Sequence, residues 1–426
     1  MSHEGKLAIL VGGGPAPGIN SVIAAASIRA CLEGIEVLGI RNGFSGLMAG
    51  DLDTATPLTI DRVSRIHFRG GSAIGTSRAN PTRDSDAMAA TIHSFEQLGV
   101  TQVLTIGGDD TAFSASRLAA ASDLRVVHVP KTIDNDLDLP QNIDTFGYQT
   151  ARHVGVNLIQ NLMVDARTTS RWYFVIAMGR KAGHLALGMG KASGATLTLI
   201  PEEFGSSPVS IDRLVNILTG AIIKRQAEGR SDGVAVIAEG VCIGIREEDL
   251  AGIGSVERDD HGHIRLSEID IGRVLRHRVR DELAELGIES TIVSKDIGYE
   301  LRSADPIPYD MEYTRDLGYC AAKFLMDGGS GVMVSMQEGR FVPIRFHDLM
   351  DESTGRMRVR MVDTHSTRYA IARRYMIRLR KDDFDDPVTL ESLARTSGLS
   401  SEAFRSRFEH ACDGELPPLD LDQGSA

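Results

Sequence analysis

Residues Thr105–Asp136 read TIGGDDTAFSASRLAAASDLRVVHVPKTIDND and contain a helical segment. An apolar run, Val103–Ile106, overlaps the start of this stretch, Thr111–Ala121 has the length and composition of a helix, and Arg125–Val129 has the pattern of a second buried strand. A strand, a helix and a second strand in this order predict a βαβ unit with two buried, parallel strands. This segment therefore predicts an α/β fold with a mostly parallel sheet.

A polar cluster follows each of the two expected strands. Gly107, Gly108, Asp109 and Asp110 follow the first strand, and Lys131–Asp136, KTIDND, follows the second. In open α/β sheets, ligands bind at this edge, where helix N-termini and free backbone N–H groups point. The two glycines would let the backbone approach an anion, but the two aspartates would repel a bare phosphate. The pattern therefore predicts a cation, Mg²⁺, between carboxylate and phosphate.

The composition narrows the class of protein. The chain has 426 residues, a hydrophobic content of 42% and a formal net charge of −12, which favour two or three domains and argue against a nucleic-acid or membrane-surface partner. Its 4 cysteines contain no CxxC pair, so neither a disulfide framework nor a zinc site is expected. With no leader sequence and no apolar run of about 18 residues, we expect a cytoplasmic protein.

A first βαβ unit precedes the central one. Leu7–Val11 and Glu36–Ile40 have the pattern of strands, and Ile19–Leu32 has that of a helix. The glycine-rich loop after the first strand does not favour NAD binding, because Pro17 stands where a dinucleotide fingerprint has glycine and Arg41 follows the second strand in place of an acid. No GxxxxGK[ST] motif occurs either, which argues against a P-loop NTPase.

Polar residues also follow two later strands. Trp172–Ala177 leads into Met178–Arg180, and Gly233–Ala238 leads into Glu239. Four expected strands thus deliver polar groups to their carboxyl ends, as at ligand sites of α/β sheets. Arg69–Arg78, RGGSAIGTSR, is rich in glycine and is expected to be a loop that faces phosphate.

Two later segments have recognisable patterns. Ser330–Ile344 is expected to form a hairpin that turns at Glu338–Arg340. Arg368–Asp382 combines basic residues with Tyr375, Met376 and Ile377, a composition typical of a solvated helix with one core face.

Together these motifs resemble those of the phosphofructokinase family, and within it the pyrophosphate-dependent branch. The matching motifs are GGGPAPGIN at 12–20, GGDDT at 107–111, PKTIDND at 130–136, MGR at 178–180, AEG at 238–240 and GYELR at 298–302. The resemblance extends from Gly12 to about Leu379. It implies two Rossmann-like three-layer α/β domains with mostly parallel sheets, an active site in the cleft between them, and assembly as a homodimer or homotetramer.

The resemblance also implies a reaction and a division of the chain. Residues 1–146 would bind pyrophosphate and magnesium, residues 147–302 would bind the sugar phosphate, and residues 303–426 would return to both domains and end in a flexible tail. The reaction would move a phosphoryl group from pyrophosphate to the 1-hydroxyl of fructose 6-phosphate, reversibly, in glycolysis or gluconeogenesis.

Such a transfer needs an acceptor for the hydroxyl proton, a metal for the donor oxygens and fixed positive charge. By the resemblance, Asp134 is the catalytic base, and Thr132 and Asp136 orient it. Asp109 is the magnesium-linked aspartate, and Arg180 completes the catalytic set.

Donor binding is assigned by the resemblance to Gly14, Arg78, Gly108, Asp110 and Lys131. The ATP-using branch has glycine at the position of Asp110. A carboxylate there occupies space near the α-phosphate of ATP and adds negative charge, which disfavours ATP. Lys131 replaces a glycine of the main ATP-using group, but some ATP-using members carry the lysine too. Asp110 is therefore the residue that indicates pyrophosphate.

Substrate binding is assigned by the resemblance to a second set, in which Glu239 contacts sugar hydroxyls and Arg302 clamps phosphate. Tyr299 stands where the ATP-using branch has histidine. Arg171 and Lys295 match arginines that reach a neighbouring subunit's site, although a lysine lacks the bidentate fork of an arginine. The complete set is Arg171, Met178, Gly179, Arg180, Glu239, Lys295, Tyr299 and Arg302.

Three alternatives can be weighed against this interpretation. An ATP-dependent 6-phosphofructokinase would share the motifs but not Asp110. NAD-kinase and lipid-kinase relatives carry a GGDG-type loop but lack the TIDND and MGR motifs. A catalytically silent regulatory subunit would have lost catalytic residues, whereas Asp109, Asp134, Arg180 and Glu239 are all present.

Overall fold

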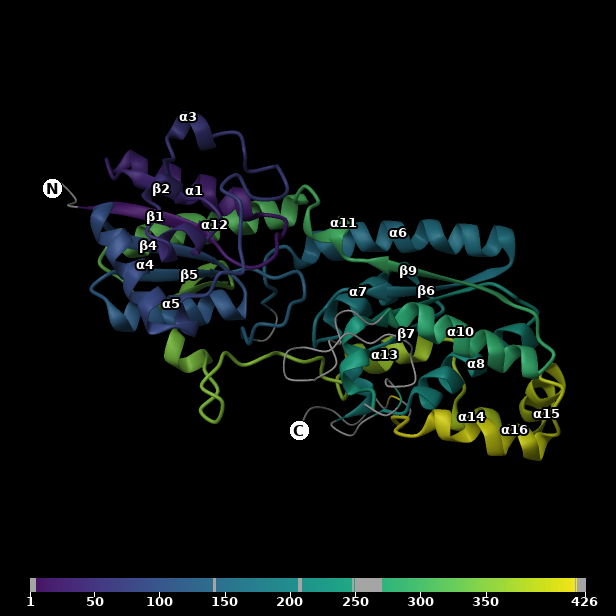
Figure 1. The fold of residues 1–426 in the computed structure, drawn as a ribbon. Coiled ribbons are helices and arrows are strands. Elements are labelled where there is room, and N and C mark those ends of the chain that lie inside the picture. The colour runs from purple at the N-terminus through teal and green to yellow at the C-terminus, as the bar shows by residue number, and fades with distance from the viewer. Residues whose placement is uncertain are drawn as a thin grey trace. The chain divides into compact units, whose positions relative to one another are not determined.

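A computed structural model describes residues 5–140, 143–205, 209–246, 249, 270–417 and 419. The chain divides into two compact units, each built from two stretches of sequence (Figure 1). The first unit comprises Met1–Val154 and Tyr299–Arg360, and the second comprises Gly155–Gly298 and Met361–Ala426. The expected roles of the sequence segments 1–146, 147–302 and 303–426 stay predictions.

The first unit is built on a seven-stranded sheet with the order β11-β10-β5-β4-β1-β2-β3. All neighbouring strands are parallel except at the two edges, where β3 pairs with β2 and β11 pairs with β10 in antiparallel fashion. This sheet confirms the predicted mostly parallel α/β class. The strands are β1 Lys6–Val11, β2 Val37–Ile40, β3 Ala55–Pro57, β4 Val100–Gly107, β5 Arg125–Pro130, β10 Val332–Gln337 and β11 Arg340–Arg345.

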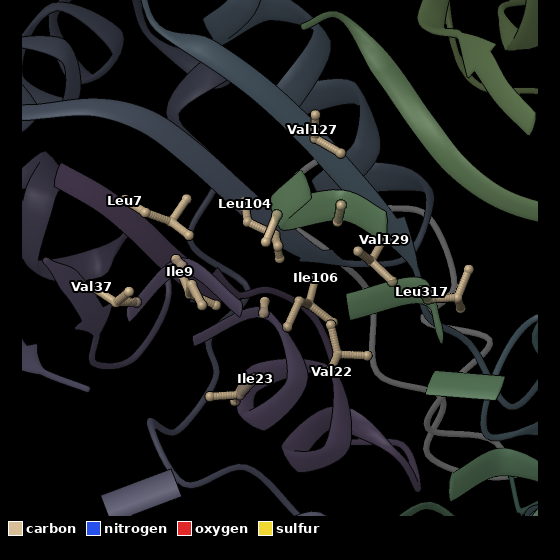
Figure 2. Close-up of a cluster of buried hydrophobic side chains, with 14 of the residues drawn as sticks. Leu7, Ile9, Val22, Ile23, Val37, Leu104, Ile106, Val127, Val129 and Leu317 are labelled. Carbon is tan, nitrogen blue, oxygen red and sulfur yellow. The ribbon is translucent and has the colours of Figure 1, made fainter. Parts of the chain in front are cut away.

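Helices cover both faces of this sheet, because its central strands carry buried apolar side chains on both faces. In β1, Leu7, Ile9 and Val11 face one layer of helices, while Ala8 and Leu10 face the other. Each large apolar side chain buried in this way contributes about 1.5–3 kcal/mol. One layer contains α1 Ile19–Leu32 and α12 Pro308–Met326, and the other contains α4 Ser85–Gln97 and α5 Asp109–Ala121. Figure 2 shows the first layer's cluster, with the labelled side chains Leu7, Ile9, Val22, Ile23, Val37, Leu104, Ile106, Val127, Val129 and Leu317.

The second unit is built on a parallel four-stranded sheet with the order β7-β8-β6-β9. Helix α7 packs on β7 and β8, and α10 packs on β6, β9 and α8. The strands are β6 Arg171–Ala177, β7 Leu197–Leu199, β8 Gly233–Ala238 and β9 Thr291–Ile297. The helices are α7 His184–Ser193, α8 Ile211–Ala227, α10 Ile271–Glu285, α13 Thr367–Tyr375, α14 Lys381–Asp385, α15 Pro387–Thr396 and α16 Ser401–Phe408.

The remaining α-helices are α2 Ser45–Met48, α3 Ile60–Val63, α6 Tyr148–Thr169 and α11 Tyr299–Arg302. Helix α6 carries the chain from the first unit into the second. Among the helices that the structure describes, none has both the length and the apolar content needed to cross a membrane.

The expected hairpin is confirmed: β10 and β11 pair in antiparallel fashion from Val332 with Arg345 to Gln337 with Arg340. Its two turn residues, Glu338 and Gly339, both have positive φ, 51° and 75°. Positive φ at both central positions is the geometry whose twist matches that of the strands.

The prediction of a single helix over Arg368–Asp382 is wrong. Helix α13 ends at Tyr375, and α14 begins at Lys381. The end of α13 is capped by a side chain, because Arg380 Nη2 donates hydrogen bonds to the backbone carbonyls of Arg373 and Arg374, at 2.9 and 3.0 Å. Such a cap satisfies carbonyls that have no partner inside the helix.

Candidate active site

Three neighbouring strands of the first unit end beside one another. Strands β5, β4 and β1 are adjacent and parallel, so the loops after them emerge at one edge of the sheet. From β1 the chain proceeds to β2 on one side, and from β4 it proceeds to β5 on the other. This reversal between β1 and β4 is a topological switch point, where α/β sheets bind ligands.

Lys131 connects the loops that follow β5, β4 and β1. Its backbone N–H donates a hydrogen bond to Gly107 O at 2.8 Å, and its Nζ donates one to Gly14 O. The side chain is buried, with 4% of the residue exposed. The structure thus brings together Lys131 and Gly14, which the sequence assigned to donor binding.

Two glycines are required here by packing. A Cβ added to Gly12 would lie 2.2 Å from Thr111 Oγ1, and one added to Gly107 would lie 2.3 Å from Thr111 Cβ. Gly107 is buried and makes room for Thr111, and the expectation that it lets the backbone approach an anion stays a prediction. Gly108 is less confined, because its added Cβ would meet only Lys131 O, at 3.5 Å.

Asp109 and Asp110 lie in the first turn of α5, which begins two residues before the expected helix start at Thr111. Carboxylates are favoured there, because the backbone N–H groups of the first turn are not used within the helix. Asp110 is exposed, and Asp109 is partly buried. No group of three or more His, Cys, Asp or Glu side chains in the described part of the chain could hold a metal. Mg²⁺ often takes one or two carboxylates and completes its shell with phosphate oxygens and water, a pattern that Asp109 fits.

The TIDND loop after β5 is buried. Thr132, Asp134 and Asp136 are only 8%, 7% and 5% exposed. The Asp134 backbone N–H donates to Thr132 Oγ1 at 3.0 Å, and Thr145 Oγ1 donates to Thr132 O at 2.7 Å. Asn135 between the two aspartates has a left-handed backbone, φ 57°, a conformation that asparagine tolerates better than most residues.

Arg360 binds the backbone of this loop, and sequence reasoning missed it. Its Nε donates to Asn135 O at 3.2 Å, its Nη1 to Ile143 O at 2.9 Å, and its backbone N–H to Asp136 O at 2.8 Å. Burial lowers the pKa of the Arg360 guanidinium. Because Arg360 lies 225 residues after Asn135 in the chain, no local pattern could have linked them.

His128 on β5 is a second residue that the sequence did not single out. Its Nε2 lies 2.9 Å from Gly107 O, and its Nδ1 lies 2.8 Å from Thr105 Oγ1. Burial lowers the pKa of the imidazole to about 3, so the ring is neutral. With Nε2 as donor and Nδ1 as acceptor, His128 joins the end of β4 to β5.

Arg302, expected in the sugar-phosphate set, lies beside the first glycine loop. A Cβ added to Gly14 would be 3.2 Å from Arg302 Nη1. The guanidinium lies over the ring of Tyr299, 4.5 Å from its centroid, and Tyr299 is exposed. Stacking on an aromatic ring orients the guanidinium and leaves its N–H edge for other partners.

The expected phosphate-facing loop, residues 69–78, is held against the same glycine loop. Thr76 Oγ1 donates to Gly13 O at 2.6 Å, and the Gly13 N–H donates to Ser77 O at 2.8 Å. Asn20 holds the other end, because its Nδ2 donates to Arg69 O at 3.0 Å. The structure therefore places Arg78, an exposed residue, next to the donor loops of the first unit.

In the second unit, Glu239 organises the MGR loop. Its Oε1 accepts the backbone N–H groups of Gly179 and Arg180, at 3.1 and 2.7 Å. Arg180 has a left-handed backbone, φ 52°, and the Met178 N–H donates to Ile297 O of β9 at 3.0 Å. The ends of β6, β8 and β9 thus bring together Met178–Arg180 and Glu239, as expected.

Arg171 and Lys295 are not brought to that edge. Arg171 is the first residue of β6, seven positions before Met178, and Lys295 pairs with Val175 in the middle of the strand. Because paired residues and alternate residues share a face of a sheet, Arg171 and Lys295 lie on the same face. Arg171 Nε is 3.9 Å from Asp165 Oδ2.

The motifs follow one another in a set order along the chain, and each lies at the end of a strand. Known proteins share this arrangement. The profile of the phosphofructokinase family matches residues 6–325. This chain belongs to the phosphofructokinase family. The match includes all the residues that the sequence singled out for catalysis, donor binding and substrate binding, from Gly14 to Arg302.

Several relatives in this family are similar over most or nearly all of the chain. The pyrophosphate–fructose 6-phosphate 1-phosphotransferase of Thermotoga maritima is 51% identical over 419 residues, 97% of this chain and 99% of that one. The enzyme of the same name from Naegleria fowleri is 47% identical over 415 residues, 95% of each chain. An ATP-dependent 6-phosphofructokinase of Mycobacterium bovis is 32% identical over 345 residues, 78% of this chain and 90% of that one.

The fold is also shared with solved structures. The pyrophosphate-dependent phosphofructokinase of Nitrosospira multiformis superposes with a TM-score of 0.66 at 16% identity, covering 99% of this chain and 95% of that one. At this identity the likeness concerns the fold alone. It agrees with the two-domain α/β architecture that the motifs predict.

Proposed function

We propose that this protein transfers a phosphoryl group from pyrophosphate to the 1-hydroxyl of fructose 6-phosphate, giving fructose 1,6-bisphosphate and phosphate, reversibly. The observation that carries the proposal is the buried TIDND loop, which follows β5, beside the end of β4, where α5 begins with Asp109 and Asp110. The names of the relatives at 51% and 47% identity support the reaction. We place the enzyme in the cytoplasm, in glycolysis or gluconeogenesis.

Asp134 is the proposed general base. Its carboxylate takes the proton from the 1-hydroxyl as the oxygen attacks phosphorus, a role that requires a fixed position and an ionised group. Thr132 fixes the backbone of Asp134 through the 3.0 Å hydrogen bond to Oγ1. Arg360 holds the carbonyls of Asn135 and Asp136, so it acts as a positioning residue for the same loop.

Asp109 is the proposed protein ligand of Mg²⁺. When bound, this ion would neutralise negative charge on the donor oxygens, so that a donor could lie near the Asp109 carboxylate. Lys131 and Arg78 supply fixed positive charge to the donor, and the Lys131 side chain reaches Gly14 O. The donor therefore binds next to positive charges whose positions are fixed before it arrives. Electrostatic stabilisation by such preorganised charges accounts for most of the catalysis in phosphoryl transfer.

Met178, Gly179, Arg180, Glu239 and Arg302 are the residues proposed to bind the sugar phosphate. Glu239 holds the backbone of Gly179 and Arg180 and has a second carboxylate oxygen for sugar hydroxyls. Arg180 stabilises the charge that develops during transfer. Arg171 and Lys295, which lie away from this edge, are proposed to act in the site of a neighbouring subunit of a homodimer or homotetramer.

The choice of donor rests on Asp110. Its carboxylate is exposed in the first turn of α5, beside Gly108. Pyrophosphate ends where ATP continues into its α-phosphate, so a negative charge there penalises ATP more than pyrophosphate. The more similar relatives carry pyrophosphate in their names, and an ATP-dependent member is similar only at 32% identity.

The proposal is tested by assaying the purified single chain with fructose 6-phosphate, Mg²⁺ and pyrophosphate. We expect fructose 1,6-bisphosphate and phosphate to form, and the reverse reaction to proceed. Asp134→Asn should bind both substrates but turn over about 10² times more slowly or worse, the usual loss for a general base. Turnover of this variant within a few-fold of wild type would refute the assignment of the base. No turnover of the wild type would favour a regulatory subunit.

A further inference from the structure

A cavity of about 650 Å³ lies in the second unit, and its lining contains none of the residues assigned to catalysis or substrate binding in the sequence. Its walls come from α13, from the start of α14 and from the chain segment that includes Glu415 and Leu416. Its volume lies within the range of small-molecule sites, roughly 300–1,000 Å³.

The cavity wall carries more positive than negative charge. The ionisable residues of the lining are Arg373, Arg374, Arg380, Lys381, Asp382 and Glu415. Four cations thus face two carboxylates in a chain whose formal net charge is −12. A local cationic surplus in an acidic protein favours an anionic ligand.

Two of the four basic side chains already make contacts that stabilise the fold. Arg373 Nη1 pairs with Glu203 Oε2 at 3.2 Å, and Arg380 Nη2 caps α13. Arg374 and Lys381, in contrast, are exposed, and their side chains have no hydrogen bond or ion pair with the described residues. Burial lowers the pKa of Arg380, and the charges of Arg374 and Arg373 lower it further, while Glu415 and Asp383 act in the opposite direction. An anion between the cations would relieve the repulsion among them.

The rest of the wall is apolar. Ile371 and Tyr375 are four residues apart on α13, so they lie on one face of the helix, and Arg374 lies beside them. The Tyr375 side chain is unusually open for an aromatic residue, with the residue 81% exposed. Leu416 faces the same cavity. An exposed aromatic ring next to an arginine suits a flat apolar group that stacks on it.

We propose that this cavity binds an organic phosphate that has a flat apolar portion. The phosphate lies between Arg374 and Lys381, whose two positive charges match its two negative ones. The apolar portion lies against Tyr375 and Ile371. The site is separate from the proposed function, so its test does not depend on catalytic turnover.

The test uses phenyl phosphate as the probe and isothermal titration calorimetry at low salt as the measurement. We expect Arg374→Ala combined with Lys381→Ala to weaken binding at this site by tenfold or more, because each alanine removes a charged hydrogen-bond donor. The matched control is Arg340→Ala combined with Arg345→Ala, which removes the same charge from exposed positions of β11. The control should leave the affinity unchanged, and the melting temperatures of both variants should match that of wild type.

A second comparison tests the apolar portion. Wild type should bind phenyl phosphate several-fold more tightly than inorganic phosphate, and Tyr375→Ala should remove that preference. The proposal is overturned if the Arg374/Lys381 variant binds phenyl phosphate as wild type does. It is also overturned if the Arg340/Arg345 control loses as much affinity, or if inorganic phosphate binds wild type equally well.

Discussion

Asp110 is the residue that we propose sets the preference for pyrophosphate over ATP. Asp110→Gly removes a negative charge from the first turn of α5 and frees the space of its side chain. Because like charges held close together cost several kcal/mol, we expect kcat/KM for ATP to rise by about tenfold or more while that for pyrophosphate falls. Steady-state kinetics with both donors provides the measurement. If the glycine variant gains nothing with ATP, Asp110 does not set the donor.

Arg360 should affect turnover through the TIDND loop. Arg360→Met leaves the carbonyls of Asn135 and Ile143 without their donor, so we expect kcat to fall by about tenfold or more with little change in KM. Arg360→Lys should be intermediate, since lysine lacks the planar fork. The matched control is Arg358→Met, which alters a nearby surface arginine that pairs with Asp138.

A readout specific to positioning is chemical rescue. Adding guanidinium ion at a concentration below its denaturing range should restore part of kcat in Arg360→Ala. If kcat stays low while the ion restores only the melting temperature, Arg360 stabilises the fold without positioning the catalytic loop.

At the scale of elements, the strand–helix alternation in the first unit could be predicted from periodicity. Strand β5 begins at Arg125 as expected, and α1 has the predicted bounds Ile19–Leu32. The residues that fix the strand ends could not be predicted, because their partners are far away in the chain. Arg360, which binds the TIDND loop, is one such distant partner. Thr111, against which Gly12 packs, is another. Local patterns predict elements, whereas tertiary contacts decide how their ends are held.

The buried His128, which joins β4 to β5 through its hydrogen bonds, makes the free energy of unfolding depend on pH. Its pKa is about 3 in the fold, against an ordinary value of 6.5, so the unfolded chain binds the extra proton between these values. The free energy of unfolding should therefore fall as the pH decreases from 6.5 towards 3, by up to about 1.4 kcal/mol per pH unit from this group. His128→Gln cannot take up that proton, so its stability should fall less steeply in the same range. Denaturant unfolding at several pH values measures both slopes, and equal slopes would show that His128 does not contribute.

At the scale of the whole molecule, the motifs predicted the α/β class and the family, because each motif follows a strand of a parallel sheet. Arg171 and Lys295 are the exception, since they lie within strands and away from the Met178–Arg180 loop. We propose that they act in the site of a neighbouring subunit. The oligomeric state of the protein therefore tests whether these two residues belong to a site.

Mixing two inactive variants tests this shared site. Arg171→Ala and Asp134→Ala should each be inactive as homo-oligomers. A verified hybrid dimer should recover up to about half of wild-type activity, because one of its two sites would combine an intact Arg171 with an intact Asp134. Size-exclusion chromatography and activity of the mixed, refolded protein provide the measurement. A hybrid that is well formed but inactive would place Arg171 outside the neighbour's site.

The proposed function depends above all on pyrophosphate being the phosphoryl donor. Its most direct test is a competition in which wild-type protein, fructose 6-phosphate and Mg²⁺ are supplied with pyrophosphate and ATP at equal concentrations. Phosphorus NMR follows both donors in the same tube. We predict that the pyrophosphate signal is replaced by those of phosphate and fructose 1,6-bisphosphate while ATP stays intact. Conversion of ATP to ADP ahead of any loss of pyrophosphate would contradict the claim.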